Sequence, residues 1–159
     1  MLGGAFNPPH IGHLLLAQEA RWQLELDSVL LMVTGRAPHK EIEPEPGPEV
    51  RLELAKLAAH DETGVEASDL ELDGEGPSYT HLTMERLRDE DPSRQLFLLL
   101  GADAVAGLES WERPERVVEL ARLGVVPRQN VEPGAVTAAL GRLNAADRVE
   151  MIDMPLCGV

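Results

Sequence analysis

Short apolar runs alternate with longer amphipathic segments along this chain. Continuous apolar runs are typical of parallel strands covered on both faces, and they occur at Val29–Val33 and Leu96–Leu100. Two shorter strand candidates are Leu123–Val126 and Val149–Ile152. Apolar residues at helical spacing predict helices between these runs. The predicted helices are Ile11–Leu26, Glu49–His60, Thr80–Arg88, Glu115–Ala121 and Gly134–Leu143.

The regular succession of strand and helix predicts the α/β class, with a parallel sheet flanked by helices in a single domain over residues 1–159. Two loops interrupt the pattern, Arg36–Pro48, which is rich in proline, and Gly74–Pro77. Loops at the carboxyl ends of parallel strands line the ligand crevice of such sheets. Both loops are therefore candidate parts of a binding site.

The composition of the chain excludes several classes of function and of site. Of the 159 residues, 28 are Asp or Glu and 14 are Lys or Arg, giving a formal charge of −14, which argues against nucleic-acid and membrane-surface partners. Cys157 is the single cysteine, which excludes an internal disulfide and any multi-cysteine metal site. No apolar run approaches bilayer length and no signal pattern opens the chain, so we expect a cytoplasmic protein.

The most informative segment runs from Gly3 to His13. Its glycines precede a helix predicted to begin near His10, and a glycine turn with a helix N-terminus favours a phosphate. His10 and His13 are three residues apart, so both imidazoles share one face of the first helical turn. One alternative is a capped helix with solvated histidines. The other is a metal site, for which two histidines alone supply few ligands.

This segment resembles the G-G-x-F-N-P-x-H-x-G-H signature of HIGH-superfamily nucleotidyltransferases, and most closely that of bacterial nicotinate-nucleotide adenylyltransferases. The resemblance implies a Rossmann-like fold and adenylyl transfer from ATP to nicotinate mononucleotide, a step toward NAD. It implies Mg²⁺ bound through the ATP phosphates and no metal site built by the protein. The catalytic residues it implies are His10 and His13, with ATP bound by Gly3, Gly4, Ala5, Phe6, His10, Gly12 and His13.

Weaker matches follow in the order the family has them, in Pro38–Lys40, Gly76–Thr80, Gly101–Asp103 and Trp111. They imply that Gly101 and Asp103 bind ATP. The implied substrate-binding residues are Lys40, Tyr79, Thr80, Asp103 and Trp111. Ordinary roles compete with these: Lys40 as a solvated loop lysine, Thr80 as a helix cap, Asp103 as a turn residue and Trp111 as a core residue. His60 and His81 are expected on the surface or on a helix face.

Two departures from the family pattern matter. Ala5 stands where the family often has Thr or Ser, and the Ser-Ser/Ala-Thr-x-x-Arg motif of a late helix is absent from the sequence. We therefore expect a marginally stable fragment that lacks a full first strand and a C-terminal phosphate-binding helix. The rival interpretations are a pantetheine-phosphate adenylyltransferase and a catalytically impaired nucleotide-binding fragment. The sequence leaves open a homo-oligomer and the choice between acid and amide mononucleotides.

Overall fold

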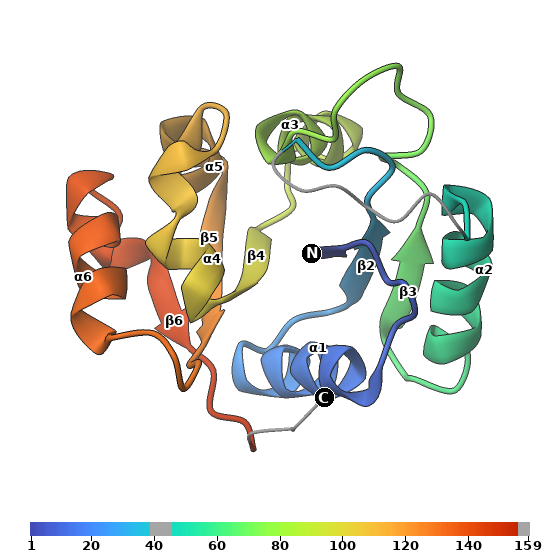
Figure 1. The fold of residues 1–159 in the computed structure, drawn as a ribbon, viewed down its shortest axis with the longest axis horizontal. Helices are drawn as coiled ribbons and strands as arrows, with labels where there is room; N and C mark the ends of the chain where they lie inside the picture. Colours follow the sequence, from blue (N-terminus) through green and yellow to red (C-terminus); the bar gives the residue numbers. More distant parts are fainter. Residues whose placement is uncertain (39–45, 156–159) are drawn as a thin grey trace. The chain divides into compact units, whose positions relative to one another are not determined.

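The structure is a computed structural model that describes residues 1–38 and 46–155 (Figure 1). Its contacts divide the chain into two compact units. The first comprises Met1–Tyr79 with Met154 and Pro155, and the second comprises Thr80–Asp153. The strands within each unit pair in parallel, as the sequence predicts for an α/β fold.

The first unit contains three strands in the order β3-β2-β1. Leu2 is paired with Leu31, and Val29 is paired with Val65. The elements are β1 (Leu2–Gly4), α1 (Ile11–Gln23), β2 (Val29–Val33), α2 (Pro48–Ala59) and β3 (Val65–Ser68).

Strand β2 forms the centre of this unit because it has a neighbouring strand on each side. Leu31, Met32 and Val33 are completely buried. Ala20 of α1 and Ala55 of α2 are completely buried as well, and both helices contact β2. The continuous apolar run in the sequence thus corresponds to a strand covered on both faces.

The second unit contains three strands in the order β4-β5-β6. Helix α3 packs on α5, and α4 packs on α6. The elements are α3 (Thr80–Glu90), β4 (Leu96–Gly101), α4 (Ala102–Ala106), the 3₁₀ turn η1 (Leu108–Ser110), α5 (Pro114–Leu120), β5 (Ala121–Val126), α6 (Pro133–Arg142), the 3₁₀ turn η2 (Ala146–Arg148) and β6 (Val149–Met151).

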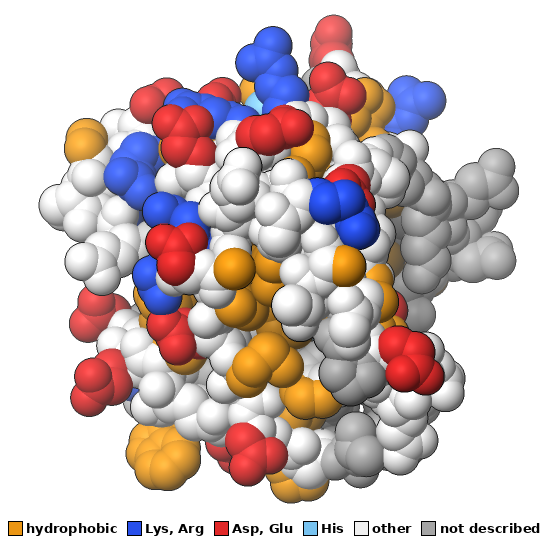
Figure 2. Space-filling view, turned by 90° about the vertical axis from the view of Figure 1, so that its left-hand side faces the viewer, with side chains coloured by type: hydrophobic (Ala, Val, Ile, Leu, Met, Phe, Trp, Pro, Cys, Tyr) orange, Lys and Arg blue, Asp and Glu red, His pale blue; other side chains and the backbone are white. Residues whose placement is uncertain are grey.

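Basic side chains on the surface of the second unit pair with acidic ones. Arg122 donates to Glu150 at 2.6 Å, and Arg142 donates to Glu109 at 2.7 Å. Figure 2 shows acidic and basic side chains interspersed on the face that it draws. Exposed pairs of this kind each contribute little stability, about 0–1 kcal/mol.

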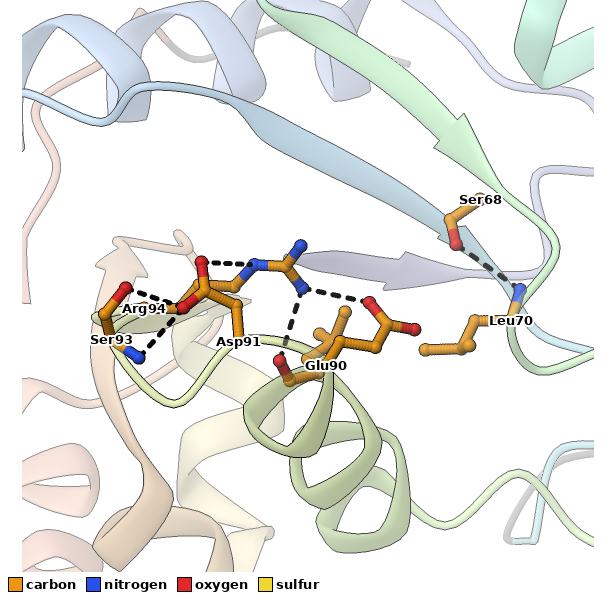
Figure 3. Close-up of polar contacts among 7 residues, drawn as sticks. Ser68, Leu70, Glu90, Asp91, Ser93 and Arg94 are labelled. Atoms are coloured by element: carbon orange, nitrogen blue, oxygen red, sulfur yellow. Dashed lines mark hydrogen bonds and ion pairs between the residues drawn. The ribbon is translucent and has the colours of Figure 1, made fainter.

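Local polar contacts define the turn that leads from α3 into β4 (Figure 3). Asp91 accepts hydrogen bonds from the Ser93 hydroxyl at 2.6 Å and the Ser93 backbone N–H at 3.0 Å. These bonds lower the pKa of the Asp91 carboxyl. Arg94 donates to Glu90 at 3.0 Å and to the Leu87 carbonyl at 3.2 Å, which satisfies a carbonyl at the helix end.

The predicted α/β class is confirmed, and the predicted helices are all present with ends that differ by at most three residues. The sequence did not predict β3 or the short helix α4. Strand β3 alternates apolar and polar residues, Val-Glu-Ala-Ser, because it pairs only with β2 in this unit and is half exposed. Among the described helices, none combines the length and apolar character that crossing a bilayer requires.

The loop after β2 approaches the loop after β3 closely at Gly35. A Cβ atom at this position would lie 2.7 Å from the backbone oxygen of Glu71. We expect Gly35→Ala to lower the free energy of unfolding by about 1–3 kcal/mol, measured by urea denaturation, because backbone cannot yield as a side chain can.

Gly74→Ala is the matched control, since a Cβ there would meet nothing within 4 Å. It should change the unfolding free energy by no more than about 0.5 kcal/mol. Equal stability of the two variants would show that the close approach of Gly35 to Glu71 does not exist in solution.

Candidate active site

The loop between β1 and α1 turns sharply at Phe6. Phe6 has a φ of 50°, in the left-handed region that non-glycine residues rarely occupy, and its side chain is 2% exposed. A Cβ atom at Gly4 would lie 3.2 Å from the Phe6 ring. Gly4 therefore leaves the room in which the ring folds back beneath the loop.

His10 and His13 lie together at the start of α1. His10 is the N-cap residue, and its backbone N–H donates to Nδ1 of His13 at 3.1 Å. The two imidazole rings are stacked with centroids 3.7 Å apart, and the Phe6 ring meets His13 edge to face at 4.9 Å. The predicted shared face is thus present in the structure, while the roles of the two histidines stay predictions.

The hydrogen bond to His13 selects one form of its imidazole. A nitrogen that accepts a hydrogen bond carries no proton, so the neutral ring must carry its proton on Nε2. His13 therefore has Nε2–H as its donor. A donor of defined position beside a helix N-terminus suits a ligand that carries oxygen anions.

The electrostatic setting at the start of α1 favours an anion. The first turn of α1 contains no acidic residue, whereas α2 has Glu49 and α5 has Glu115 in theirs. No carboxylate of its own first turn therefore offsets the partial positive charge of this helix N-terminus. This local field opposes the repulsion that the chain's formal charge of −14 would exert on a phosphate.

Arg51 joins this loop to the loop after β2. Its side chain is 2% exposed, and Nη1 donates to the carbonyl oxygens of Ala5 at 2.6 Å and Thr34 at 2.9 Å. Burial lowers the pKa of Arg51, and the neighbouring Glu49 raises it by a smaller amount. Arg51 was not among the site residues that the sequence predicts.

One signal in the sequence could have identified Arg51. The buried side chains of α2 are Leu52, Ala55 and Ala59 together with Arg51, which stands four residues before Ala55. A charged residue on the apolar face of an amphipathic helix is unusual and requires a polar partner.

A second loop of the first unit carries the predicted substrate residue Tyr79. The Ser78 N–H donates to the Arg36 carbonyl at 2.7 Å, and the Arg36 N–H donates to the Ser78 hydroxyl at 3.4 Å. The loops that follow β2 and β3 are thereby joined beside Tyr79. Two loops at the carboxyl ends of neighbouring strands suit a ligand crevice.

The second unit contains the remaining described candidates. Asp103 lies in the first turn of α4, exposed, with Oδ1 3.8 Å from Nε of Arg128. Thr80 is the first residue of α3, and Trp111 follows η1 with its side chain half buried, so a core role for Trp111 is not supported. Arg128, a basic residue just past the end of β5, was not among the site residues that the sequence predicts.

Lys40 and the three remaining histidines differ in where they lie. Lys40 and His39 lie outside the described residues. His60 is exposed, and of the two positions expected for His81, the surface or a helix face, His81 has the second, since it lies on α3 with 5% exposure. Within residues 1–38 and 46–155, no three His, Cys, Asp or Glu side chains are grouped so as to hold a metal ion.

Comparison with known proteins identifies the family of the chain. The family model described as cytidylyltransferase-like matches residues 1–155. A probable nicotinate-nucleotide adenylyltransferase of Roseiflexus sp. (strain RS-1) is 45% identical over 135 residues, 85% of this chain and 65% of that protein. Another, from Synechococcus sp. (strain JA-3-3Ab), is 37% identical over 155 residues, 98% of this chain and 75% of that protein.

A solved structure extends the comparison to the fold. The Plasmodium falciparum nicotinic acid mononucleotide adenylyltransferase complexed with NaAD matches with a TM-score of 0.78 at 15% identity, over 99% of this chain and 75% of that chain. At this identity the match shows the fold alone, which is the Rossmann-like fold that the sequence predicts.

The hydrogen bond from His10 to His13 predicts a tautomer that NMR can measure. In ¹⁵N-edited spectra of the imidazole nitrogens, recorded where the ring is neutral, His13 should show protonated Nε2 and unprotonated Nδ1. The side chain of His60, which is 81% exposed, supplies the reference spectrum of a solvated ring. A protonated Nδ1 in neutral His13 would contradict the arrangement.

Proposed function

Because the chain belongs to the cytidylyltransferase-like family, among the nicotinate-nucleotide adenylyltransferases, we propose that it transfers the adenylyl group of ATP to nicotinate mononucleotide. The products are nicotinate adenine dinucleotide and pyrophosphate. The observation that carries the proposal is the stacked pair His10 and His13 at the start of α1, next to the loop that turns at Phe6. Histidine donors, backbone amides and a helix N-terminus together suit a polyphosphate.

The reaction requires no nucleophile from the protein. A phosphate oxygen of nicotinate mononucleotide attacks the α-phosphorus of ATP in line, and the bond from that phosphorus to the bridging oxygen breaks as pyrophosphate leaves. Catalysis of this kind consists of positioning and charge stabilisation. Nε2–H of His13 and the imidazole of His10 donate to phosphate oxygens, on which negative charge is redistributed in the transition state.

Magnesium enters with the nucleotide, as MgATP. The described residues offer no cluster of metal ligands, and Mg²⁺ prefers phosphate oxygens and water to an all-protein cage. The ion supplies neutralisation of phosphate charge. The protein's own contribution is the histidine pair and the loop amides.

The remaining candidate residues have proposed roles in the recognition of the two substrates, each taken within its own unit. Asp103 accepts hydrogen bonds from ribose hydroxyls, and Gly101 lets the nucleotide approach the backbone before α4. Tyr79, Thr80 and Lys40 bind nicotinate mononucleotide. Trp111 stacks on the pyridine ring.

A turnover assay with MgATP and nicotinate mononucleotide tests the proposal. Nicotinamide mononucleotide and 4′-phosphopantetheine, offered separately as acceptors, distinguish this activity from those of related adenylyltransferases. Formation of nicotinate adenine dinucleotide and pyrophosphate in equal amounts is the expected result. ATP binding without turnover on any acceptor would instead identify a nucleotide-binding protein without catalysis.

The histidine pair yields a kinetic prediction. His10→Ala and, separately, His13→Ala should each lower kcat by roughly 10²–10³, because each removes a donor that acts in the transition state. The melting temperature should change little. His60→Ala is the matched control, since its side chain is 81% exposed and is not among the proposed site residues. Near-normal kcat in either site variant would refute its assigned role.

Trp111 yields a prediction about substrate choice. A ring stack contributes about 0.5–1.5 kcal/mol beyond area burial, so Trp111→Ala should raise KM for nicotinate mononucleotide roughly three- to tenfold and leave KM for ATP nearly unchanged. Trp22→Ala, which removes a tryptophan that is 79% exposed on α1, should alter neither KM. An equal rise in both KM values for Trp111→Ala would assign Trp111 a structural role.

A further inference from the structure

Arg51 is held inside the first unit by two backbone carbonyls rather than by an acid. Nη1 donates to Ala5 at 2.6 Å and to Thr34 at 2.9 Å, while the buried Nε has no hydrogen-bond partner among the described residues. No carboxylate of the described chain forms an ion pair with it, although Glu49 is close enough to influence its pKa. Among residues 1–38 and 46–155, the guanidinium charge therefore lacks the direct neutralisation that buried arginines usually have.

The two carbonyls belong to loops that leave neighbouring parallel strands at the same edge of the sheet. Ala5 follows β1, and Thr34 follows β2, where the Thr34 N–H also donates to the Gly4 carbonyl at 2.9 Å. One side chain from α2 thus sets the spacing of both loops at the carboxyl ends of these strands. Ligands bind at this edge in open α/β sheets.

The bond to Ala5 also fixes the direction of a backbone donor. In a trans peptide the C=O and the N–H of the next residue point to opposite sides. When the Ala5 carbonyl points toward Arg51, the Phe6 N–H must point away from it, on the other side of the loop. Phe6 is the residue that turns the chain, with a φ of 50°, and its ring contacts the imidazole of His13.

We propose that Arg51 is a positioning residue for the reaction: it holds the Ala5–Phe6 peptide so that the Phe6 N–H faces the polyphosphate of the nucleotide. The inference rests on the proposed function, because it names how the loop of that same site is held. The arrangement is indirect, since Arg51 is buried behind the loop and contacts backbone rather than substrate. Its positive charge, without an ion pair in the described chain, adds to the field that attracts the phosphates.

Arg51→Met removes the donors and the charge while keeping most of the side-chain volume. We expect kcat to fall roughly 10- to 100-fold, because misplacement of a catalytic loop by about 1 Å can cost 10²-fold. KM for nicotinate mononucleotide should stay within about twofold. Arg51→Lys, which restores a charged donor but not the planar fork, should recover part of the lost kcat.

A binding measurement provides a readout that needs no turnover. Titration of the ¹⁵N-labelled protein with inorganic tripolyphosphate should shift the Phe6 amide resonance in the native protein. In Arg51→Met the shift should shrink, or require at least about tenfold more tripolyphosphate. A Phe6 amide that tripolyphosphate does not move in the native protein would overturn the inference.

Arg88→Met is the matched control. Arg88 of α3 also has a buried Nε without a partner in the described chain and donates to a carbonyl, that of Leu120 at 3.0 Å, which is not part of the proposed site. Loss of Arg88 should lower the melting temperature without changing kcat measured well below that temperature. Equal kcat losses in Arg88→Met and Arg51→Met would reduce Arg51 to a structural residue and overturn the inference.

The outcomes separate the two proposals. Absence of turnover in the native protein, with an Arg51-dependent tripolyphosphate shift, would refute the proposed function and support the positioning of the loop. Normal turnover in the native protein with unchanged kcat in Arg51→Met would support the proposed function and overturn the positioning role of Arg51. If Arg51→Met does not fold, the Arg51→Lys variant provides the test. A folded Arg51→Lys protein with a lowered melting temperature, but with unaltered kcat and an unaltered response of the Phe6 amide to tripolyphosphate, would overturn the inference.

Discussion

The left-handed backbone conformation at Phe6 sets the path of the chain from β1 into α1. Such a conformation costs a non-glycine residue on the order of 1–3 kcal/mol. Burial of the phenyl ring offsets that cost by about 1.5–3 kcal/mol, and the absence of a side chain at Gly4 makes the burial sterically feasible. The ring then supports His13, so the turn and the histidine pair form one packed arrangement.

The same loop is held from behind by α2. The Arg51 guanidinium binds the carbonyl of Ala5 directly before the turn and the carbonyl of Thr34 in the next loop. A buried carbonyl without a partner costs about 1–3 kcal/mol, so these bonds stabilise the loop conformation as well as satisfying Arg51. The loop thus leads into the histidine pair at the start of α1, and Arg51 holds the same loop at Ala5.

The proposed anion site at the start of α1 lies in a chain of net negative charge. The formal charge of −14 is distributed over a surface on which many acidic groups are already paired with arginine, such as Glu85 with Arg116 at 2.8 Å. The Arg116 hydrogen bond lowers the pKa of Glu85 and keeps that carboxyl ionised. At α1, by contrast, a helix N-terminus without acidic residues in its first turn and a buried arginine give a locally positive field.

The sequence by itself determined the α/β class, the ends of most helices and the juxtaposition of His10 with His13, because these follow from hydrophobic period and from spacing along one helix. The tertiary structure decided what depends on residues distant in the chain. Strand β3 was not predictable, since its half-exposed pattern acquires meaning only beside β2. Arg51 lies 46 residues from Ala5 and 17 from Thr34, and His81 is buried by neighbours that its own helix pattern does not specify. Local propensity carries no information about such partners, because the partners exist only when the strands have paired and the helices have packed on them.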